Sequence, residues 1–188
     1  MERCEWPSTN ALMIEYHDCE WGVPVHDEIK LFKFLVLEAF QAGLSWQTIL
    51  NKRENFRKAF DKFDYLKIAA YNAAKEEELT QDAGIIRNRL KIKATIGNAK
   101  AFIKIQQEYG SFDHFIWQFT KHKPINNHLT TLKEMPAKSA ESDAMSRALM
   151  AYGFKFVGST ICYAFMQATG MVNDHLAKCF RHEEVRNM

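Results

Sequence analysis

The sequence contains few residues that interrupt helices and few that favour strands. Only four of its 188 residues are proline and eight are glycine, and valine is scarce beside alanine, lysine, leucine and isoleucine. Proline and glycine weaken helices, whereas valine favours strands. We therefore expect an all-α protein. Hydrophobic residues make up 47% of the sequence, which is enough to bury a sizeable core.

Long apolar runs are also missing. No 18 consecutive apolar residues occur, which excludes a typical membrane-spanning helix, and residues 1–6 do not have the pattern of a signal sequence or transit peptide. We therefore expect an intracellular protein. In that environment cysteines are expected to be thiols or metal ligands, and not a disulfide framework. The four cysteines are Cys4, Cys19, Cys162 and Cys179.

The sequence has almost no excess of charge, because 25 basic and 23 acidic residues leave a formal net charge of +2. The net charge therefore does not indicate a polyanionic partner. Basic residues nevertheless concentrate in residues 84–104, around an apolar stripe with helical spacing. They are Arg87, Arg89, Lys91, Lys93, Lys100 and Lys104. This run is compatible with a solvated helix face or with a nucleic-acid-binding surface, and both interpretations stay open.

A single carboxylate, Glu38, lies in the most apolar part of the chain. Residues 31–40 predict a buried helix that begins after Asp27 and ends at Gly43. At 100° per residue, Lys33 and Glu38 lie about 140° apart, so Glu38 does not share the solvent-exposed face that Lys33 marks. Glu38 is then either buried, where a ligand can pair with it, or at a second exposed edge of the helix.

The turn after this helix carries a large aromatic side chain. Ser45 is expected to cap a second helix that extends to Phe60, which places Trp46 on the connection, where it can face a pocket. Residues 1–26 look irregular but are dense in aromatic residues and in metal-ligand residue types. A flexible tail rarely has this composition, so we expect the segment to pack against the body of the protein.

Two helices with a short connection bounded by glycines are predicted further along the chain. Ser142 is expected to cap the first, which extends to about Tyr152, and Ser159 begins the second. Gly158 allows a close backbone approach, and the free N–H groups of the second helix favour an anion such as phosphate. The same pattern also fits a plain helical hairpin without a ligand.

A metal site could join the two ends of the chain. His175 and Cys179 are four residues apart, so on a helix they would project from one face and could bind one ion. Cys4 and His17 would complete a Cys2His2 set suited to zinc. Spacing does not require this pairing, because other residues of these types are present: Cys19, His26, Cys162 and His182. Four protein ligands leave no open position, so such an ion would be structural.

Three groups of residues together carry a resemblance to a known family. They are residues 1–4 with Trp6 and 16–24, then 37–38 with 41–46, and finally 153–158 with 173–175. From residue 1 to about residue 180, the sequence resembles the 3-methyladenine DNA glycosylase I family, bacterial repair enzymes of the helix-hairpin-helix glycosylase superfamily. The resemblance implies one helical glycosylase unit over residues 1–180. Residues 181–188 are expected to form a disordered polar tail.

The resemblance also implies roles for individual residues. Glu38 and Tyr16 would contact the damaged base as catalytic residues. The base would lie among three tryptophans: Trp46, Trp6 and Trp21. One structural zinc ion would be bound by Cys4, His17, His175 and Cys179. DNA phosphates would be bound by the glycine-bounded connection and the helix start that follows it: Lys155, Phe156, Val157, Gly158, Ser159 and Thr160.

Three further residues bear on the comparison with the family. Asp174 lies near the place of the superfamily's catalytic aspartate, but as the neighbour of His175 we interpret it as structural. Phe40 and Cys19 depart from the family pattern, which affects the expected shape of the pocket.

The implied activity is base-excision repair of alkylated DNA. The enzyme would flip 3-methyladenine out of a duplex and hydrolyse its N-glycosidic bond, leaving an abasic site without a lysine Schiff base. We expect a monomer in the bacterial cytoplasm that acts at the nucleoid. Two alternatives stay open: a zinc-stabilised module that binds damaged DNA without catalysis, and an enzyme for a small soluble nucleobase. Only a duplex-binding protein should lose affinity steeply as salt rises.

Overall fold

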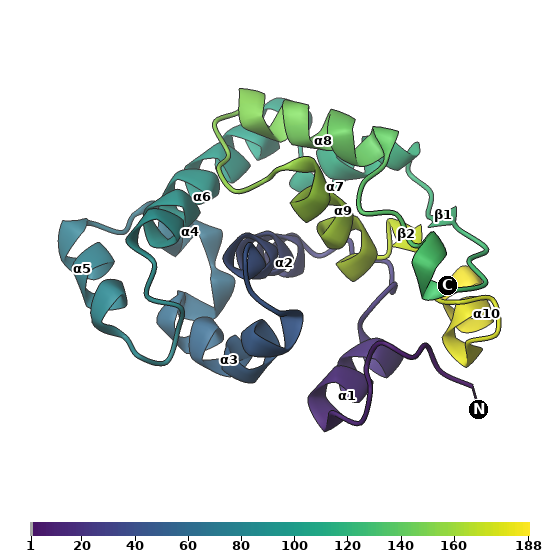
Figure 1. The fold of residues 1–188 in the computed structure, drawn as a ribbon. Coiled ribbons are helices and arrows are strands. Elements are labelled where there is room, and N and C mark those ends of the chain that lie inside the picture. Colours follow the sequence, from purple (N-terminus) through teal and green to yellow (C-terminus); the bar gives the residue numbers. More distant parts are fainter. Residues whose placement is uncertain (1) are drawn as a thin grey trace.

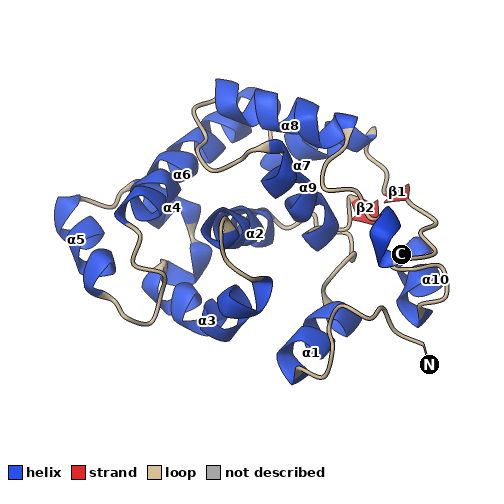
Figure 2. Ribbon diagram, in the orientation of Figure 1, coloured by secondary structure: helices blue, strands red, loops and turns tan. Residues whose placement is uncertain are grey.

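The structure, a computed structural model, describes residues 2–188; Met1, with which the first motif begins, lies outside the described residues. These residues form ten α-helices, three short 3-10 helices and two strands of two residues each, so helices make up most of the ribbon (Figure 2). The α-helices are α1 (Ala11–Cys19), α2 (Glu28–Gln41), α3 (Trp46–Ala59), α4 (Tyr65–Ala69), α5 (Ala73–Gln81), α6 (Arg89–Tyr109), α7 (Phe112–Trp117), α8 (Ala140–Ala151), α9 (Ser159–Ala168) and α10 (Phe180–Arg186). The predicted helical class is confirmed.

The remaining elements are short. The 3-10 helices are η1 (Asp61–Phe63), η2 (Gln118–Thr120) and η3 (Leu132–Glu134). The strands β1 (Ile125–Asn126) and β2 (Val172–Asn173) pair in parallel, with Ile125 opposite Val172. This pair joins the long connection before α8 to the segment that follows α9. None of the helices in residues 2–188 has the length and apolar character needed to cross a membrane.

Helix α2 is the centre of the fold. Figure 1 shows it almost end-on, with α3, α6 and α9 around it, and it packs against these helices and against α7. Within residues 31–40 every side chain except Lys33 is buried. The nearly continuous apolar run is thus explained by burial on almost all sides of one helix.

The predicted caps of the two helices nearest the pocket are confirmed. The Asp27 side chain accepts a hydrogen bond from the Lys30 N–H at the start of α2 (2.8 Å). The Ser45 hydroxyl accepts one from the Thr48 N–H at the start of α3 (3.2 Å). The turn between them passes through Gly43 with φ of +81°, a conformation that favours glycine.

Helix α8 begins three residues earlier than predicted. Ser139, and not Ser142, is its N-cap, and the two serines form a reciprocal pair in which each side chain accepts from the other's backbone N–H. Either serine fits the sequence pattern of a cap. The structure selects Ser139 because Ser142 is completely buried against the body of the protein.

The two ends of the chain are more regular than predicted. The N-terminal segment contains α1, whose cap Asn10 accepts from the Met13 N–H. Residues 181–188 were predicted to be disordered, and this is wrong, because α10 covers most of them. Arg181, His182 and Val185 of α10 are buried, so contacts with the body of the protein order a segment whose composition alone suggests a tail.

Candidate active site and metal centre

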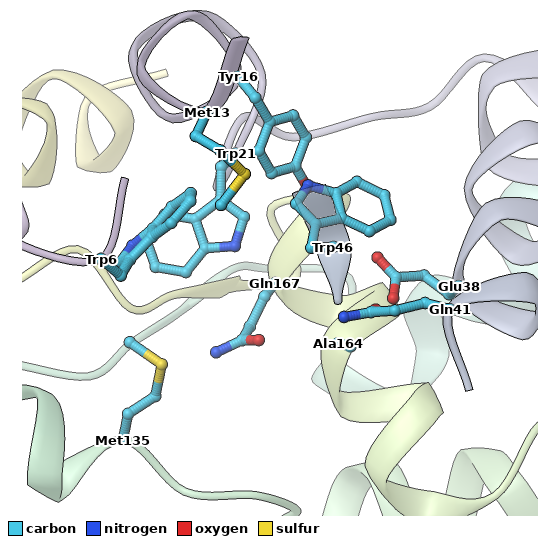
Figure 3. Close-up of a pocket in the computed structure, with 10 residues that line it drawn as sticks. All are labelled: Trp6, Met13, Tyr16, Trp21, Glu38, Gln41, Trp46, Met135, Ala164 and Gln167. Atoms are coloured by element: carbon cyan, nitrogen blue, oxygen red, sulfur yellow. The ribbon is translucent and has the colours of Figure 1, made fainter. Parts of the chain in front are cut away.

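Four helices and the N-terminal segment surround one small cavity of about 170 Å³. Helix α1 contributes Tyr16, α2 contributes Glu38, α3 begins with Trp46, and α9 forms a further wall. The complete lining is shown in Figure 3: Trp6, Met13, Tyr16, Trp21, Glu38, Gln41, Trp46, Met135, Ala164 and Gln167. All five residues predicted to contact the base therefore line the same cavity.

Glu38 lies at the floor of the cavity and is only 3% exposed. Its Oε2 atom is buried and has no hydrogen-bond partner among the described residues. Burial raises the pKa of Glu38 to about 8. Of the two alternatives from the sequence, the structure thus supports the buried carboxyl group, and an unpaired buried oxygen is a site for a donor supplied by a ligand.

Tyr16 also lines the cavity and, like Glu38, is only 3% exposed. Its ring centroid is 5.1 Å from that of Trp46, which positions the two rings as adjoining walls. Burial, and then the negative charge of Glu38, raise the pKa of Tyr16 well above its ordinary value. The Tyr16 hydroxyl therefore keeps its proton and can donate it in a hydrogen bond.

Three tryptophans give the cavity its apolar walls. The rings of Trp6 and Trp21 meet edge to face, with centroids 5.1 Å apart. The indole N–H groups of Trp6 and Trp46 are buried without a hydrogen-bond partner in residues 2–188. A narrow aromatic cavity with unpaired donors and an unpaired carboxyl group suits a flat ring with polar edges.

The mouth of the cavity contains residues that were not predicted. Gln41 lies three residues after Glu38 on the same helix, so helical spacing could have predicted that it lines the same cavity. Met13, Met135 and Gln167 carry no comparable signal. They come from distant segments, and only the packing of α1, η3 and α9 brings them together.

The predicted metal ligands form one buried cluster at the joined ends of the chain. The ligand atoms of Cys4, His17, His175 and Cys179 all lie within 4.8 Å of one another. Cys179 Sγ is 3.6 Å from His17 Nε2 and 3.7 Å from His175 Nδ1. In a tetrahedral site, Zn–S and Zn–N bonds of about 2.3 and 2.05 Å imply S···N separations of roughly 3.6 Å. These two separations therefore fit a tetrahedral zinc site.

The outer nitrogen of each histidine in this cluster also has a partner. His17 Nδ1 lies 2.6 Å from the Asp18 carboxylate, and His175 Nε2 lies 2.9 Å from the Trp21 carbonyl. Such partners orient metal-binding imidazoles. The second contact directly connects the cluster to Trp21, which is a wall of the cavity.

The four-residue spacing of His175 and Cys179 would place them on one face of a helix, but the two residues are not on a helix. They lie on a turn between β2 and α10. The Leu176 N–H donates to Cys4 Sγ and the Ala177 N–H donates to the Leu129 carbonyl. Because these amides have partners elsewhere in the fold, the segment is not helical, and the turn nevertheless brings the two ligands together.

The glycine-bounded connection between α8 and α9 has a fixed backbone. Asn98 of α6 accepts from the Lys155 N–H and donates to the Lys155 carbonyl, at 2.8 and 3.0 Å. Phe156 has a positive φ of +57°. Val157 is buried, and its carbonyl accepts from the Ser146 hydroxyl. Gly158 provides no side-chain cap for α9, so the first N–H groups of that helix have no capping side chain.

The basic residues of α6 lie in different environments. Arg89 pairs with Glu77 at the surface. Lys91 was predicted to lie on or beside the exposed faces, but it is only 6% exposed. Its ammonium group donates to the carbonyls of Phe40 and Ala42 at the end of α2.

Phe40, Cys19 and Asp174 do not line the cavity. Phe40 is fully buried and packs edge to face on Phe56, so its side chain is not part of the cavity wall. Cys19 is exposed. Asp174 is buried and accepts hydrogen bonds from surrounding side chains, as expected for the structural interpretation.

A small buried aromatic pocket of this kind suits a single base taken out of a duplex, as the class of DNA glycosylases requires. The methyladenine glycosylase family model matches residues 6–182. The chain belongs to this family, and the resemblance found in its sequence is confirmed.

Relatives and solved structures support the same assignment over nearly the whole chain. DNA-3-methyladenine glycosylase 1 of Escherichia coli (strain K12) is 54% identical over 95% of this chain and 96% of its own. DNA-3-methyladenine glycosylase of Haemophilus influenzae is 47% identical over 94% of this chain and 96% of its own. A crystal structure of 3-methyladenine DNA glycosylase I matches with a TM-score of 0.93 at 50% identity, covering 95% of this chain and 98% of that chain. The Staphylococcus aureus enzyme, whose structure describes 3-methyladenine recognition, matches with a TM-score of 0.92 at 34% identity, covering 96% of both chains.

Proposed function

We propose that this protein is a 3-methyladenine DNA glycosylase that removes the alkylated base from duplex DNA by hydrolysis. The observation that carries the proposal is the buried carboxyl group of Glu38, which has no partner among the described residues and lies beside Trp46 and Tyr16. A buried, unpaired carboxyl group is costly in a folded protein. This cost is offset when a positively charged base enters the cavity and donates a hydrogen bond to Glu38.

Charge distinguishes the damaged base from normal adenine. Methylation at N3 makes the base in DNA cationic, and a cation in the cavity favours the ionised form of Glu38, whose pKa burial alone raises to about 8. The resulting carboxylate and the face of Trp46 attract the cationic base more strongly than neutral adenine. The exocyclic amino group can donate to Glu38, while Tyr16 supplies a further polar contact at the floor.

Positioning provides most of the catalysis. The glycosidic bond to a cationic base is already weak, because the base leaves as a neutral molecule. Contacts that become stronger as the base moves away from the sugar stabilise the transition state. No lysine lines the cavity as described in residues 2–188, which supports attack by water and release of an abasic site.

A structural zinc ion at Cys4, His17, His175 and Cys179 is part of the proposal. Its four protein ligands leave no position for a substrate, so the ion would supply folding energy and no chemistry. By joining the two ends of the chain it would fix Trp21, whose carbonyl contacts His175.

The segment from Lys155 to Thr160 is proposed to bind DNA phosphates. Its support is the uncapped start of α9 at Gly158 and the exposed side chains of Lys155 and Thr160. Val157 can take part only through its backbone, because its side chain is buried. Pocket and hairpin belong to the same chain, which supports action as a monomer.

The test is release of free 3-methyladenine from a methylated duplex by the wild-type protein and its Glu38→Gln variant. We expect the variant to excise roughly a hundredfold more slowly or worse, because the amide cannot pair with the cation. Glu54→Gln, on an exposed residue of α3, is the matched control and should excise normally. Binding of the duplex without release by the wild type would instead identify a non-catalytic module that recognises damage.

A further inference from the structure

The side-chain amide of Gln167 has a fixed orientation at the mouth of the cavity. Gln167 lies on α9, across the cavity from Glu38 (Figure 3). Its Nε2 atom donates to Asp174 Oδ2 at 2.8 Å. Because a carboxylate only accepts hydrogen bonds, Gln167 must turn its NH2 group toward Asp174 and its oxygen the other way.

Asp174 is itself fixed by two other donors. It is 1% exposed, and it accepts from Asn127 Nδ2 and from the Tyr163 hydroxyl, both at 2.8 Å. The Tyr163 oxygen also lies 3.2 Å from Asn127 Nδ2, which donates to it, so the Tyr163 proton is directed to Asp174. The carboxylate therefore cannot rotate freely, and the orientation of Gln167 is determined by a connected network.

The oxygen of Gln167 faces the cavity. In Figure 3 it lies on the side toward Glu38, with the amide nitrogen on the far side. It takes no hydrogen bond from any residue between 2 and 188, whereas the nitrogen of the same amide is paired. An acceptor with a fixed direction is thus available to a molecule in the cavity.

The depth of the cavity indicates which molecule this acceptor meets. Glu38 and Tyr16 at the floor are each 3% exposed, whereas Gln167 is only partly buried. A flipped base whose polar edge contacts the floor leaves its sugar toward the mouth. Gln167 then lies on the sugar side of the base, and the preceding helical turn contributes only the small side chain of Ala164.

We propose that Gln167 orients the water that attacks C1′, and that Asp174 acts as a positioning residue through it. The inference rests on the proposed glycosylase function. The bond between C1′ and the ring nitrogen breaks, and its electron pair stays on the base, which leaves neutral. The water oxygen bonds to C1′, and the surplus proton passes to solvent. Gln167 accepts a hydrogen bond from this water, and its negative amide end faces the positive charge that develops on the sugar.

The direct test is the Gln167→Met variant, which keeps the length of the side chain and removes the acceptor. We expect single-turnover excision from a methylated duplex to fall roughly ten- to a hundredfold. Affinity for free 3-methyladenine, measured by tryptophan fluorescence, should stay within about twofold, because the free base has no sugar. Gln81→Met, on an exposed glutamine of α5, is the matched control.

A second readout separates positioning of water from general damage to the fold. In water–methanol mixtures the wild type should yield mainly the hydrolysed abasic sugar, whereas Gln167→Met should give a larger share of the methyl glycoside. Asp174→Asn frees the amide of Gln167 to turn, so it should slow excision too, with no further loss in the double variant. Melting temperature and zinc content of Gln167→Met should be those of the wild type.

Two results would overturn the inference. Wild-type excision by Gln167→Met would show that its oxygen is not used. A parallel loss of affinity for free 3-methyladenine would instead make Gln167 a base-recognition residue. If the wild-type protein itself released no base, the proposed function would fail, and this inference with it.

Discussion

At the scale of the residue, the carboxyl group of Glu38 couples function to stability. Its pKa is about 8 in the folded protein against an ordinary 4.5 because of burial. Between these values the unfolded chain has released a proton that the folded protein retains. The stability associated with Glu38 is therefore fully present below the unfolded pKa and is lost as pH rises through the folded pKa.

Glu38→Gln should remove this dependence. From about pH 5 to about pH 9, the free energy of unfolding of the wild type should fall relative to that of the variant, by several kcal/mol at most. Urea unfolding of both proteins at a series of pH values measures the difference. Parallel curves would show that Glu38 is solvated or paired in the folded protein.

The sequence indicates part of the residue-scale result. Helical spacing separates Glu38 from the exposed face of Lys33, and the family resemblance points to Tyr16 and Trp46. Whether Glu38 is buried depends on α1 and α9, which close the cavity over it from distant parts of the chain. Gln167 could not be selected from the sequence, because its importance comes from a contact with Asp174 that packing creates.

At the scale of the element, α6 connects the end of α2 to the proposed phosphate-binding segment. Lys91 donates to Phe40 O at 2.9 Å and to Ala42 O at 2.7 Å. Asn98, two turns later, binds both backbone groups of Lys155. One rigid helix therefore fixes the distance between the base cavity and the hairpin.

Replacing Lys91 by methionine should destabilise the protein by roughly 1–3 kcal/mol, because carbonyls at the end of α2 lose a charged donor. Urea unfolding measures the loss, and Lys100→Met, on an exposed position of the same helix, serves as the control. Lys91→Arg, which keeps charged donors, should recover part of the stability. Equal stability of the two methionine variants would mean that solvent replaces Lys91 without cost.

The sequence predicts where helices begin better than it predicts which groups a long side chain contacts. Asp27 and Ser45 cap α2 and α3 as expected, because a cap depends on residues within one turn. At α8 two serines satisfy the same pattern, and tertiary burial selects between them. Lys91 was grouped with the other basic residues of this run, since its sequence neighbours do not reveal that α2 ends within reach of its ammonium group.

At the scale of the whole molecule, the fold brings together ends of the chain that are far apart in sequence. Cys4 and His17 precede the helical body, and His175 and Cys179 follow it, yet all four lie in one buried cluster. The sequence supplied the residue types and one spacing but left several combinations open. The family resemblance selected among them, and a turn, not helical spacing, brings the C-terminal pair together.

Removal of the proposed zinc ion should consequently affect the base cavity as well as the ends of the chain. A cross-link that closes so long a loop contributes on the order of 5 kcal/mol, so a strong chelator should lower the melting temperature by roughly 10 °C or more. Affinity for free 3-methyladenine should fall with it, because Trp21 loses the partner that fixes its backbone. Cys179→Ser should reproduce both effects and lower bound zinc, measured by atomic absorption, whereas Cys19→Ser, on an exposed thiol outside the cluster, should reproduce neither. A chelated protein that keeps its base affinity would show that the cavity is organised by helix packing alone, and that the metal stabilises only the two ends.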